Sequence, residues 1–264
     1  MYRLLLVTCC LTSACGRVDF GGHASGDAGV GDAALDARVP NGHDEDHDTY
    51  GDGEDNCPHV ANPGQEDGDS DGVGDACDPR PTLPGDSIVH FEPFVDMTTS
   101  MFALSGRVPT FTGDALHSDT TSGNFFLSLV ETPTNGYYEL GGHIVSQNAA
   151  NQPQIFVMSS NAATAFYYCD ADDNATETSI GLKYTFDDMT YTSVNAQDFT
   201  GRLDNEDFVI RMRIDGANGE CDETFGAESA QLGGALPVQT PTRFELFQRG
   251  LVVDVDYFVE IRSP

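Results

Sequence analysis

The sequence predicts an all-β protein, in which a two-sheet β-sandwich follows a loop-rich acidic segment. Two observations support this fold class. Between residues 86 and 264, apolar and polar residues alternate along many short segments, as they do in strands that bury one face. Residues 44–78 carry an acid at nearly every second position and contain no Lys or Arg, so their mutual repulsion opposes an apolar core there.

The sequence predicts an export signal at residues 1–15. A basic start precedes an apolar run over residues 4–11, which is too short to span a bilayer. The small residues before Cys15 resemble the signal of bacterial lipoproteins, in which this cysteine is lipidated. Thr12 stands where that signal usually has Leu, so plain secretion with cleavage near Ala14 is the alternative. Both interpretations predict a secreted protein, and lipidation predicts an outer-membrane or cell-surface lipoprotein.

Two further segments are predicted to be linkers. Residues 16–43 consist mainly of Gly, Asp and Ala without a sustained period, which is typical of a flexible tether. Residues 79–85 contain three prolines and predict a short stiff hinge. We expect this hinge to separate the acidic segment from the domain at residues 86–264.

The acids of residues 44–78 fall into two registers with the spacing of calcium loops. Positions 1, 3, 5, 9 and 12 of such a loop supply carboxylates and position 7 supplies a backbone carbonyl, which suits a hard cation that takes six to eight oxygens. Asp52 and Asp75 stand at position 9, where they bind directly or through water. The expected ligands are Asp44, Asp46, Asp48, Tyr50, Asp52 and Asp55 in the first register, and Asp67, Asp69, Asp71, Val73, Asp75 and Asp78 in the second.

In these residues the segment resembles the thrombospondin type 3 repeat. Asp55–Pro58, Asn62–Gln65 and Asp71–Asp78 reproduce the DNCP, NPxQ and DGxGDxCD parts of that family's pattern in order, with Thr49 as a departure where the family has Gly. The resemblance implies a fold with almost no apolar core, wrapped around calcium ions and stapled by disulfides. A disordered acidic linker is the alternative.

No long apolar helices flank the two registers, so we expect a calcium-stiffened spacer rather than a calcium sensor. The resemblance and the charge density predict at least two calcium ions, one for each register. Magnesium should substitute poorly because it demands a small octahedral site and retains its waters. His43, His47 and His59 lie in or beside the segment, where we expect solvated loop histidines rather than metal ligands.

The cysteines agree with export. Removal of the signal leaves five cysteines, and an odd number in a secreted protein needs an explanation, which lipidation of Cys15 supplies. The remaining four allow three pairings. Proximity in the chain, together with the resemblance, favours Cys57–Cys77 and Cys169–Cys221.

Residues 86–264 are numerous enough for one substantial core. Their alternation predicts about ten strands and no helices, which is typical of a two-sheet sandwich. Turns are expected at residues 170–174 and 215–219, which are rich in Gly, Asn and Asp. The expected strands are 87–92, 125–130, 137–145, 153–159, 164–170, 180–186, 207–215, 243–248 and 251–262.

The closing segment, residues 244–261, resembles the last strands of concanavalin A-like jelly rolls, and the strand order also fits a laminin-G or lectin-like sandwich. An immunoglobulin-like sandwich is the alternative, although the chain contains no Trp for the Cys…Trp…Cys pattern. The jelly-roll resemblance implies glycan binding, with glycan hydrolysis as the less favoured function.

Candidate residues for a glycan site are few. Tyr137, Tyr138, Tyr167, Tyr168 and Tyr191 could form an aromatic platform, but alternating tyrosines are more often half-buried strand residues. Another calcium ion could be held by Asp170, Asp172, Asp173 and Asn174, but the more ordinary interpretation of these residues is a polar turn. An acidic ligand could be bound by Lys183, Arg211 and Arg213, but such residues more often form solvated ion pairs with Asp or Glu.

We expect no enzymatic activity. Retaining glycan hydrolysis needs two carboxylates about 5 Å apart, and glucanases of this fold usually carry them in an ExDxxE motif, to which residues 220–225 come nearest but end in Phe. The net charge of −31 argues against binding to nucleic acids or anionic membranes.

The sequence therefore predicts a calcium-binding extracellular or cell-surface protein, whose stiffened repeat presents a β-sandwich for adhesion or ligand binding. The expected partners are calcium and either a glycan or a surface protein. Contact with a membrane is expected only through a lipid anchor, and the oligomeric state does not follow from the sequence.

Overall fold

The computed structural model describes residues 42–95, 101–131, 135–162, 165–173, 178–186, 190–199, 202–215, 218–237 and 243–264. The predictions for the signal, for Cys15, for residues 16–41 of the tether and for Asn174 lie outside these residues. Among the residues described, we find no helix with the length and apolar character needed to cross a bilayer.

The described residues form fifteen strands and one short 3₁₀ helix. The helix is η1 (Ala149–Asn151). The strands are β1 (Ser87–Glu92), β2 (Phe102–Gly106), β3 (Thr110–Thr112), β4 (Ala115–Asp119), β5 (Asn124–Leu129), β6 (Gly136–Gln147), β7 (Gln154–Ala162), β8 (Ala165–Asp173), β9 (Thr178–Thr185), β10 (Thr192–Phe199), β11 (Glu206–Ile214), β12 (Asn218–Phe225), β13 (Glu228–Ala235), β14 (Arg243–Arg249) and β15 (Leu251–Arg262).

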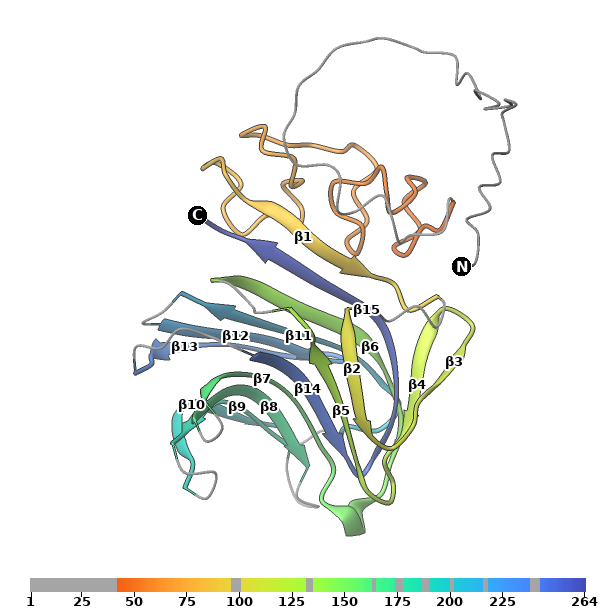
Figure 1. The fold of residues 1–264 in the computed structure, drawn as a ribbon, viewed down its shortest axis with the longest axis vertical. Coiled ribbons are helices and arrows are strands. Elements are labelled where there is room, and N and C mark those ends of the chain that lie inside the picture. Colours follow the sequence, from red (N-terminus) through yellow and green to blue (C-terminus); the bar gives the residue numbers. More distant parts are fainter. Residues whose placement is uncertain are drawn as a thin grey trace, which may run out of the picture. The chain divides into compact units, whose positions relative to one another are not determined.

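The strands build two antiparallel sheets that face each other (Figure 1). The first sheet has the order β13-β12-β11-β6-β15-β4-β3, with β1 paired to the far end of β15. The second sheet has the order β10-β9-β8-β7-β14-β5-β2. Because β14 and β15 follow each other in sequence but lie in different sheets, the chain crosses between the layers there. The predicted all-β, jelly-roll-type sandwich is confirmed.

Sequence alternation places the core between the two sheets. In β8, Cys169 and Ala171 are fully buried in this core, while Asp170 and Asp172 point to the outer face of the second sheet. The turn expected at residues 170–174 is therefore wrong over 170–173, which continue the strand. Six strands were not expected from the sequence, namely β2, β3, β4, β10, β12 and β13.

A β-bulge in β15 turns the two halves of this strand to opposite sides. Its register against β6 shifts between Val255 and Tyr257. Val255 and Phe258 both pack into the core between the sheets, whereas Tyr257, Val259 and Ile261 pack in a second cluster. One extra residue reverses every later side chain of a strand. The alternating apolar residues of residues 251–262 therefore do not share one face, although simple alternation would place them together.

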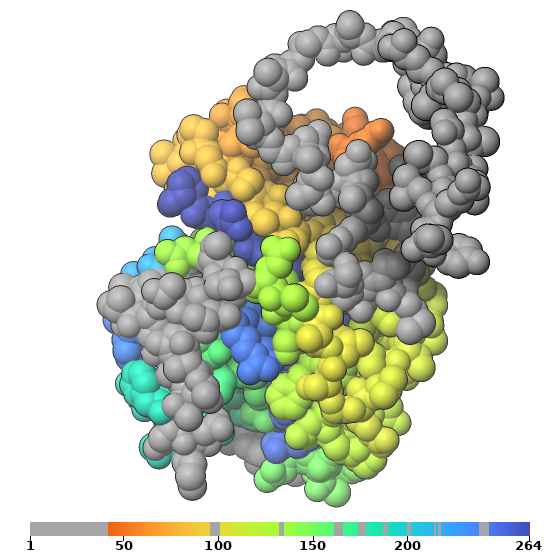
Figure 2. Space-filling model, in the orientation of Figure 1, coloured from red at the N-terminus to blue at the C-terminus, as the bar shows by residue number. Residues whose placement is uncertain are grey.

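The second apolar cluster joins the acidic segment to the outward face that the bulge creates. It contains Cys57, Val73 and Cys77 from the acidic segment, and Phe91, Val259 and Ile261 from β1 and β15. In Figure 2, gold atoms of the segment around residues 75–90 lie against the dark blue end of β15. The acidic segment thus covers apolar surface of the first sheet.

Residues 79–85 bring the acidic segment back onto β1 instead of holding the two parts apart. The Asp71 carboxylate accepts hydrogen bonds from the backbone N–H groups of Gly85 and Asp86, at 2.8 and 2.7 Å. Arg80 donates to the Asp86 carboxylate from Nε and Nη2, and Ser263 at the end of the chain donates to the same carboxylate at 2.6 Å. These polar contacts, and not the stiffness of the prolines alone, fix the path of the chain between the acidic segment and β1.

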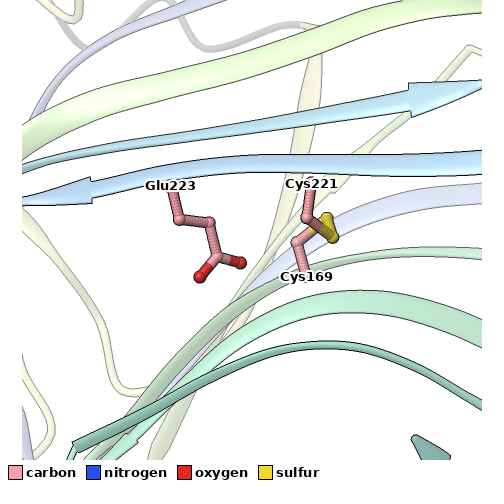
Figure 3. Close-up of side chains that lie close together, drawn as sticks. All are labelled: Cys169, Cys221 and Glu223. Carbon is pink, nitrogen blue, oxygen red and sulfur yellow. A yellow bond between two sulfur atoms is a disulfide. The ribbon is translucent and has the colours of Figure 1, made fainter. Parts of the chain in front are cut away.

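Both expected disulfides are present. Cys57–Cys77 lies inside the acidic segment, and Cys169–Cys221 joins β8 to β12 and so links the two sheets through the core. Figure 3 shows this second bridge together with Glu223, whose side chain projects from β12 toward the opposing sheet.

Candidate functional sites

Each acidic register brings its first three carboxylates together. Asp44, Asp46 and Asp48 offer oxygen atoms that all lie within 4.8 Å of one another. The loop is shaped by its own side chains, since the Asp48 N–H donates to Asp44 at 3.2 Å and to Asp46 at 3.1 Å, and Tyr50 N–H donates to Asp48 at 2.8 Å. The short polar side chains thus fold the backbone around the cluster that they form.

The second register forms two clusters. Asp67, Asp69 and Asp71 lie within the same 4.8 Å limit, and so do Asp71, Asp78 and Asp86. Asp71 therefore belongs to both. The Asp71 carboxylate also accepts a hydrogen bond from the backbone N–H of Val73 at 3.0 Å. Asp86 was not expected as a ligand because it stands after the prolines, and only the fold of residues 79–85 brings it here.

Three of the predicted ligands accept hydrogen bonds outside the carboxylate clusters. They are Asp52 and Asp55, at positions 9 and 12 of the first register, and Asp75, at position 9 of the second. Asp52 accepts from Glu45 N–H at 2.9 Å and contacts His43 Nδ1 at 2.6 Å. Asp75 accepts from Gly68 N–H at 2.7 Å. Asp55 accepts from Cys57 N–H and from Gln65 Nε2, at 2.8 and 2.7 Å, which links the DNCP and NPxQ motifs. Among the described residues, Asp52, Asp55 and Asp75 join none of the three carboxylate clusters.

The clusters have the properties of cation sites. Asp46 Oδ2, both oxygens of Asp69 and Asp78 Oδ2 are buried and accept no hydrogen bond from the described residues. Burial, opposed by hydrogen bonds and reinforced by neighbouring acids, raises the pKa of Asp46 to about 6 and that of Asp78 to about 6. Crowded, under-coordinated carboxylates of this kind suit calcium, which takes several carboxylate oxygens in flexible geometry.

His59 is buried, contrary to the expectation of a solvated loop residue. Its side chain is fully covered, its ring lies 5.2 Å from that of Tyr257, and its Nε2 lies 3.5 Å from Glu139 Oε1. Burial lowers the pKa of His59, against the opposing effect of Glu139. Glu139 also accepts from Arg211 Nε at 2.5 Å and from Tyr257 Oη at 2.7 Å. The acidic segment is thus seated on a buried polar network of the first sheet.

A different kind of site lies on the outer face of the second sheet. An open pocket of about 690 Å³ is lined by residues of β2, β5, β7, β8, β9 and β14 together with Tyr191. We call it the groove. Its volume falls within the range of small-molecule sites, and its lining combines aromatic rings with a few charged side chains.

Aromatic rings form the floor of the groove. Phe126, Phe247 and Phe156 stand opposite one another on β5, β14 and β7, so they form one row across three strands. Their ring centroids are 4.9 and 4.5 Å apart in that order. Tyr168 continues the path at 5.6 Å from Phe156, and the exposed Tyr191 follows at 5.6 Å from Tyr168.

Charged side chains border this aromatic path. Lys183 Nζ donates to Asp170 Oδ2 at 2.7 Å and to Asp172 Oδ2 at 3.1 Å. Burial and the neighbouring Asp172 hold the pKa of Asp170 well above its usual value. Burial disfavours the charged form of Lys183, but the two carboxylates outweigh it and raise its pKa. On β14, Arg243 contacts Glu245 at 2.5 Å.

The groove contains two of the five tyrosines that were proposed as a platform, Tyr168 and Tyr191. The other three lie elsewhere: Tyr138 and Tyr167 are in the core, and Tyr137 faces the acidic segment. The three phenylalanines were missed. Their strands alternate in sequence, but only the register of β5, β14 and β7 shows that their rings meet.

The charged residues that were candidates for a calcium site or an acidic-ligand site lie in different parts of the sandwich. Lys183, Asp170 and Asp172 meet in the groove, whereas the buried Asp173 pairs with Arg202 at 3.0 Å. Arg211 and Arg213 belong to the first sheet. Arg213 forms a partly exposed pair with Glu220, as the interpretation of solvated ion pairs expected, whereas Arg211 pairs with the buried Glu139, contrary to it.

Comparison with known proteins identifies the acidic segment. Residues 25–65 and 66–79 match the thrombospondin type 3 repeat family. The resemblance found in the sequence is therefore confirmed, and we call residues 44–78 the repeat. No curated protein matches the chain.

Several solved structures resemble the sandwich at low sequence identity. The carbohydrate-binding module CBM66 from Bacillus subtilis is 14% identical with a TM-score of 0.46, over 62% of this chain and 98% of that one. The β-glucanase from Bacillus licheniformis is 9% identical with a TM-score of 0.47, over 66% and 98%. The CBM2 module of the evolved Dit of Lactobacillus casei BL23 phage J-1 is 8% identical with a TM-score of 0.49, over 67% and 95%.

Proposed function

We propose that this protein is a calcium-ordered surface protein whose sandwich binds a glycan in the groove. The observation that carries the proposal is the row of Phe126, Phe247 and Phe156 with a charged cluster beside it. A sugar ring presents apolar C–H groups on its faces and hydroxyls around its edge. Stacked aromatic rings suit the faces, and a few placed polar groups suit the hydroxyls.

In the repeat, calcium would be held by the three carboxylate clusters. The first consists of Asp44, Asp46 and Asp48, and the second and third share Asp71. When bound, calcium neutralises carboxylates that otherwise repel one another. The chain's own residues supply the rest: backbone N–H groups orient the carboxylates, and the Cys57–Cys77 bridge limits how far the loops expand.

We propose that the repeat supports the sandwich rather than acting as a free spacer. Its apolar residues pack on β1 and β15, and His59 is buried against the first sheet. Distance from a membrane would then come from the tether at residues 16–43. The groove lies on the second sheet, so a repeat docked on the first sheet leaves the groove open for a glycan or for a glycosylated surface protein.

We further propose binding without hydrolysis. Asp170 and Asp172 both accept from the ammonium of Lys183, and the Asp170 side chain is buried, so these two carboxyl groups do not flank an open space that a glycosidic bond could enter. Incubation of each bound glycan with the protein should release no reducing ends. Release that is lost in Asp172→Asn would contradict this part of the proposal.

Glycan binding is tested by a glycan array followed by calorimetry on the intact protein. We expect Phe156→Ala to weaken the best ligand by about tenfold or more, on the order of 1.4 kcal/mol, because the middle of the aromatic path is removed. Phe186→Ala is the matched control, since Phe186 is exposed and lies outside the groove lining. An array without any ligand, or unchanged affinity in Phe156→Ala, would overturn the proposal.

Anchoring is a separate prediction. If Cys15 is lipidated, the wild-type protein should sediment with membranes, and Cys15→Ser should move it to the soluble fraction. Intact-mass measurement of the mature chain should show a lipid-modified Cys15 as its first residue. A wild-type protein that is wholly soluble, with Cys15 unmodified or absent, would contradict the anchor but leave the groove and the repeat unaffected.

A further inference from the structure

We propose that Lys183 and Asp172 together recognise two neighbouring hydroxyls of an uncharged glycan. This inference rests on the proposed function, because it assigns a ligand class to the same groove. It follows from four features of the groove: unspent hydrogen-bonding capacity, exposure, position beside the aromatic path and charge.

Lys183 and Asp172 each have hydrogen-bonding capacity to spare. A lysine ammonium has three N–H donors, and Lys183 uses one on Asp170 and one on Asp172. An ionised carboxylate can accept about four hydrogen bonds, and Asp172 receives one of them from Lys183. A donor and an acceptor therefore stand side by side. A pair of vicinal hydroxyls, each both donor and acceptor, complements such a pair.

The two side chains differ from Asp170 in their access to the groove. The side chains of Lys183 and Asp172 are 19% and 35% exposed, whereas that of Asp170 is 2% exposed. Asp170 therefore lies beneath the ammonium and holds it in place, so we assign it as a positioning residue. Gly181 makes room for this arrangement, because a Cβ there would lie 2.9 Å from Lys183 Cε.

The pair is placed to reach the edge of a sugar stacked on the aromatic path. Asp170 stands directly opposite Phe156 in the sheet, and Asp172 stands opposite Gln154, two pairs further along the same strands and so on the same face. Tyr168 precedes Asp170 by two residues on the same face and contacts Phe156. Side chains on one face of adjacent strands lie about 5 Å apart, which is close to the width of a sugar ring.

The charges of the groove favour an uncharged ligand. Its acids are Asp170, Asp172 and Glu245, and its bases are Lys183, Arg243 and Arg249, so the formal charges cancel. Lys183 and Arg243 are already engaged by carboxylates, and Arg249 donates to the neutral groups Gln152 O and Gln154 Oε1. A polyanion would in addition meet a protein of net charge −31. The groove therefore has no net formal charge that would favour a charged glycan over a neutral one.

The experiment measures affinities of the intact protein for three soluble glycan sets: neutral glucans, mannans, xylans and fructans; polyuronates and sulfated glycans; and polyglucosamine. We expect binding to a member of the neutral set. Asp172→Asn and Lys183→Met should each weaken it at least tenfold, whereas Asp204→Asn, an exposed acid outside the groove lining, should not. Melting curves of each variant show whether it is folded.

A second measurement separates recognition from a general loss of structure. Partial O-methylation or deoxygenation of the bound glycan should identify two adjacent hydroxyls whose loss weakens wild-type binding. For that modified ligand, Asp172→Asn should cause no further loss, because the same contact is already missing. Additive losses would overturn the assignment of Asp172.

The outcomes distinguish this inference from the proposed function. Absence of binding to all three sets overturns both. Binding confined to polyanions or to polyglucosamine, or neutral binding that is unchanged in both Asp172→Asn and Lys183→Met, overturns this inference and leaves a glycan-binding groove in place.

Discussion

Chelation of calcium from the intact protein is expected to lower the melting temperature of the sandwich by roughly 3–12 °C, as well as to loosen the repeat. The repeat buries Phe91, Val259 and Ile261 of the first sheet, and a full burial of one such side chain contributes about 1.5–3 kcal/mol. Without a cation, repulsion among the carboxylates opposes the compact repeat. The sandwich then loses part of its cover.

The measurement is calorimetry combined with hydrogen exchange of the full chain. After chelation, the largest increase in exchange is expected in residues 44–95 and 257–262, with a smaller increase in β8 and β9, which belong to the other sheet. Calcium should restore both readouts and magnesium should not. Asp69→Ala should reproduce part of the loss, since it removes two of the buried oxygens that accept no hydrogen bond within the described structure.

Glu228→Gln provides the control for charge alone, because Glu228 is an exposed acid on β13. It should melt and bind calcium as the wild type does. Equal melting temperatures and equal exchange with and without calcium would show that the repeat neither binds the ion nor supports the sandwich. Loss of order in the repeat alone, with an unchanged melting temperature, would instead contradict the docking of the repeat.

The repeat was predictable because its information is local. The ligands of each loop lie within about a dozen residues, and the motifs around Cys57 and Cys77 fix the order of the loops. The contributions of Asp86 and His59 could not be predicted, since one depends on how residues 79–85 turn and the other on an outward apolar face of β15. That face exists only because of the bulge after Val255, and a one-residue shift leaves no mark on the alternation pattern itself.

In the sandwich, too, local sequence patterns predicted some features and the fold alone determines others. Alternation predicted the strands with strong apolar faces, such as β11 and β15, but not β12 and β13, in which Gly and charged residues interrupt the pattern. The aromatic path was hidden for a different reason. Phe126, Phe156 and Phe247 are far apart in the chain, and cross-strand register is a property of the fold, not of any one segment.

Replacement of Glu223 by Met is expected to raise the free energy of unfolding by about 2 kcal/mol at pH 7. Glu223 is 1% exposed and points from β12 toward the second sheet beside the Cys169–Cys221 bridge (Figure 3). Neither of its carboxyl oxygens has a hydrogen-bond partner among the described residues. An unpaired buried polar group costs stability, and Met fills a similar volume without that cost.

The gain should depend on pH in a defined direction. Burial, together with the nearby Asp170, raises the pKa of Glu223 well above its usual value in the folded protein. Below the ordinary pKa of a glutamate, both states are protonated and the effect is constant. Above it, the unfolded chain releases the proton while the folded chain retains it, so wild-type stability falls by up to about 1.4 kcal/mol per pH unit until the raised pKa is reached.

The advantage of Glu223→Met over the wild type should therefore be larger at pH 8 than at pH 5, as measured by chemical denaturation at both values. Asp170 also has a raised pKa, but it is present in both proteins and its effect cancels in the difference. Glu220→Gln on the outer side of the same strand is the control, because Glu220 forms a partly exposed pair with Arg213 and should change stability by less than about 1 kcal/mol. A destabilised Glu223→Met, or an equal gain at both pH values, would mean that the carboxyl group of Glu223 is satisfied or ionised inside the fold.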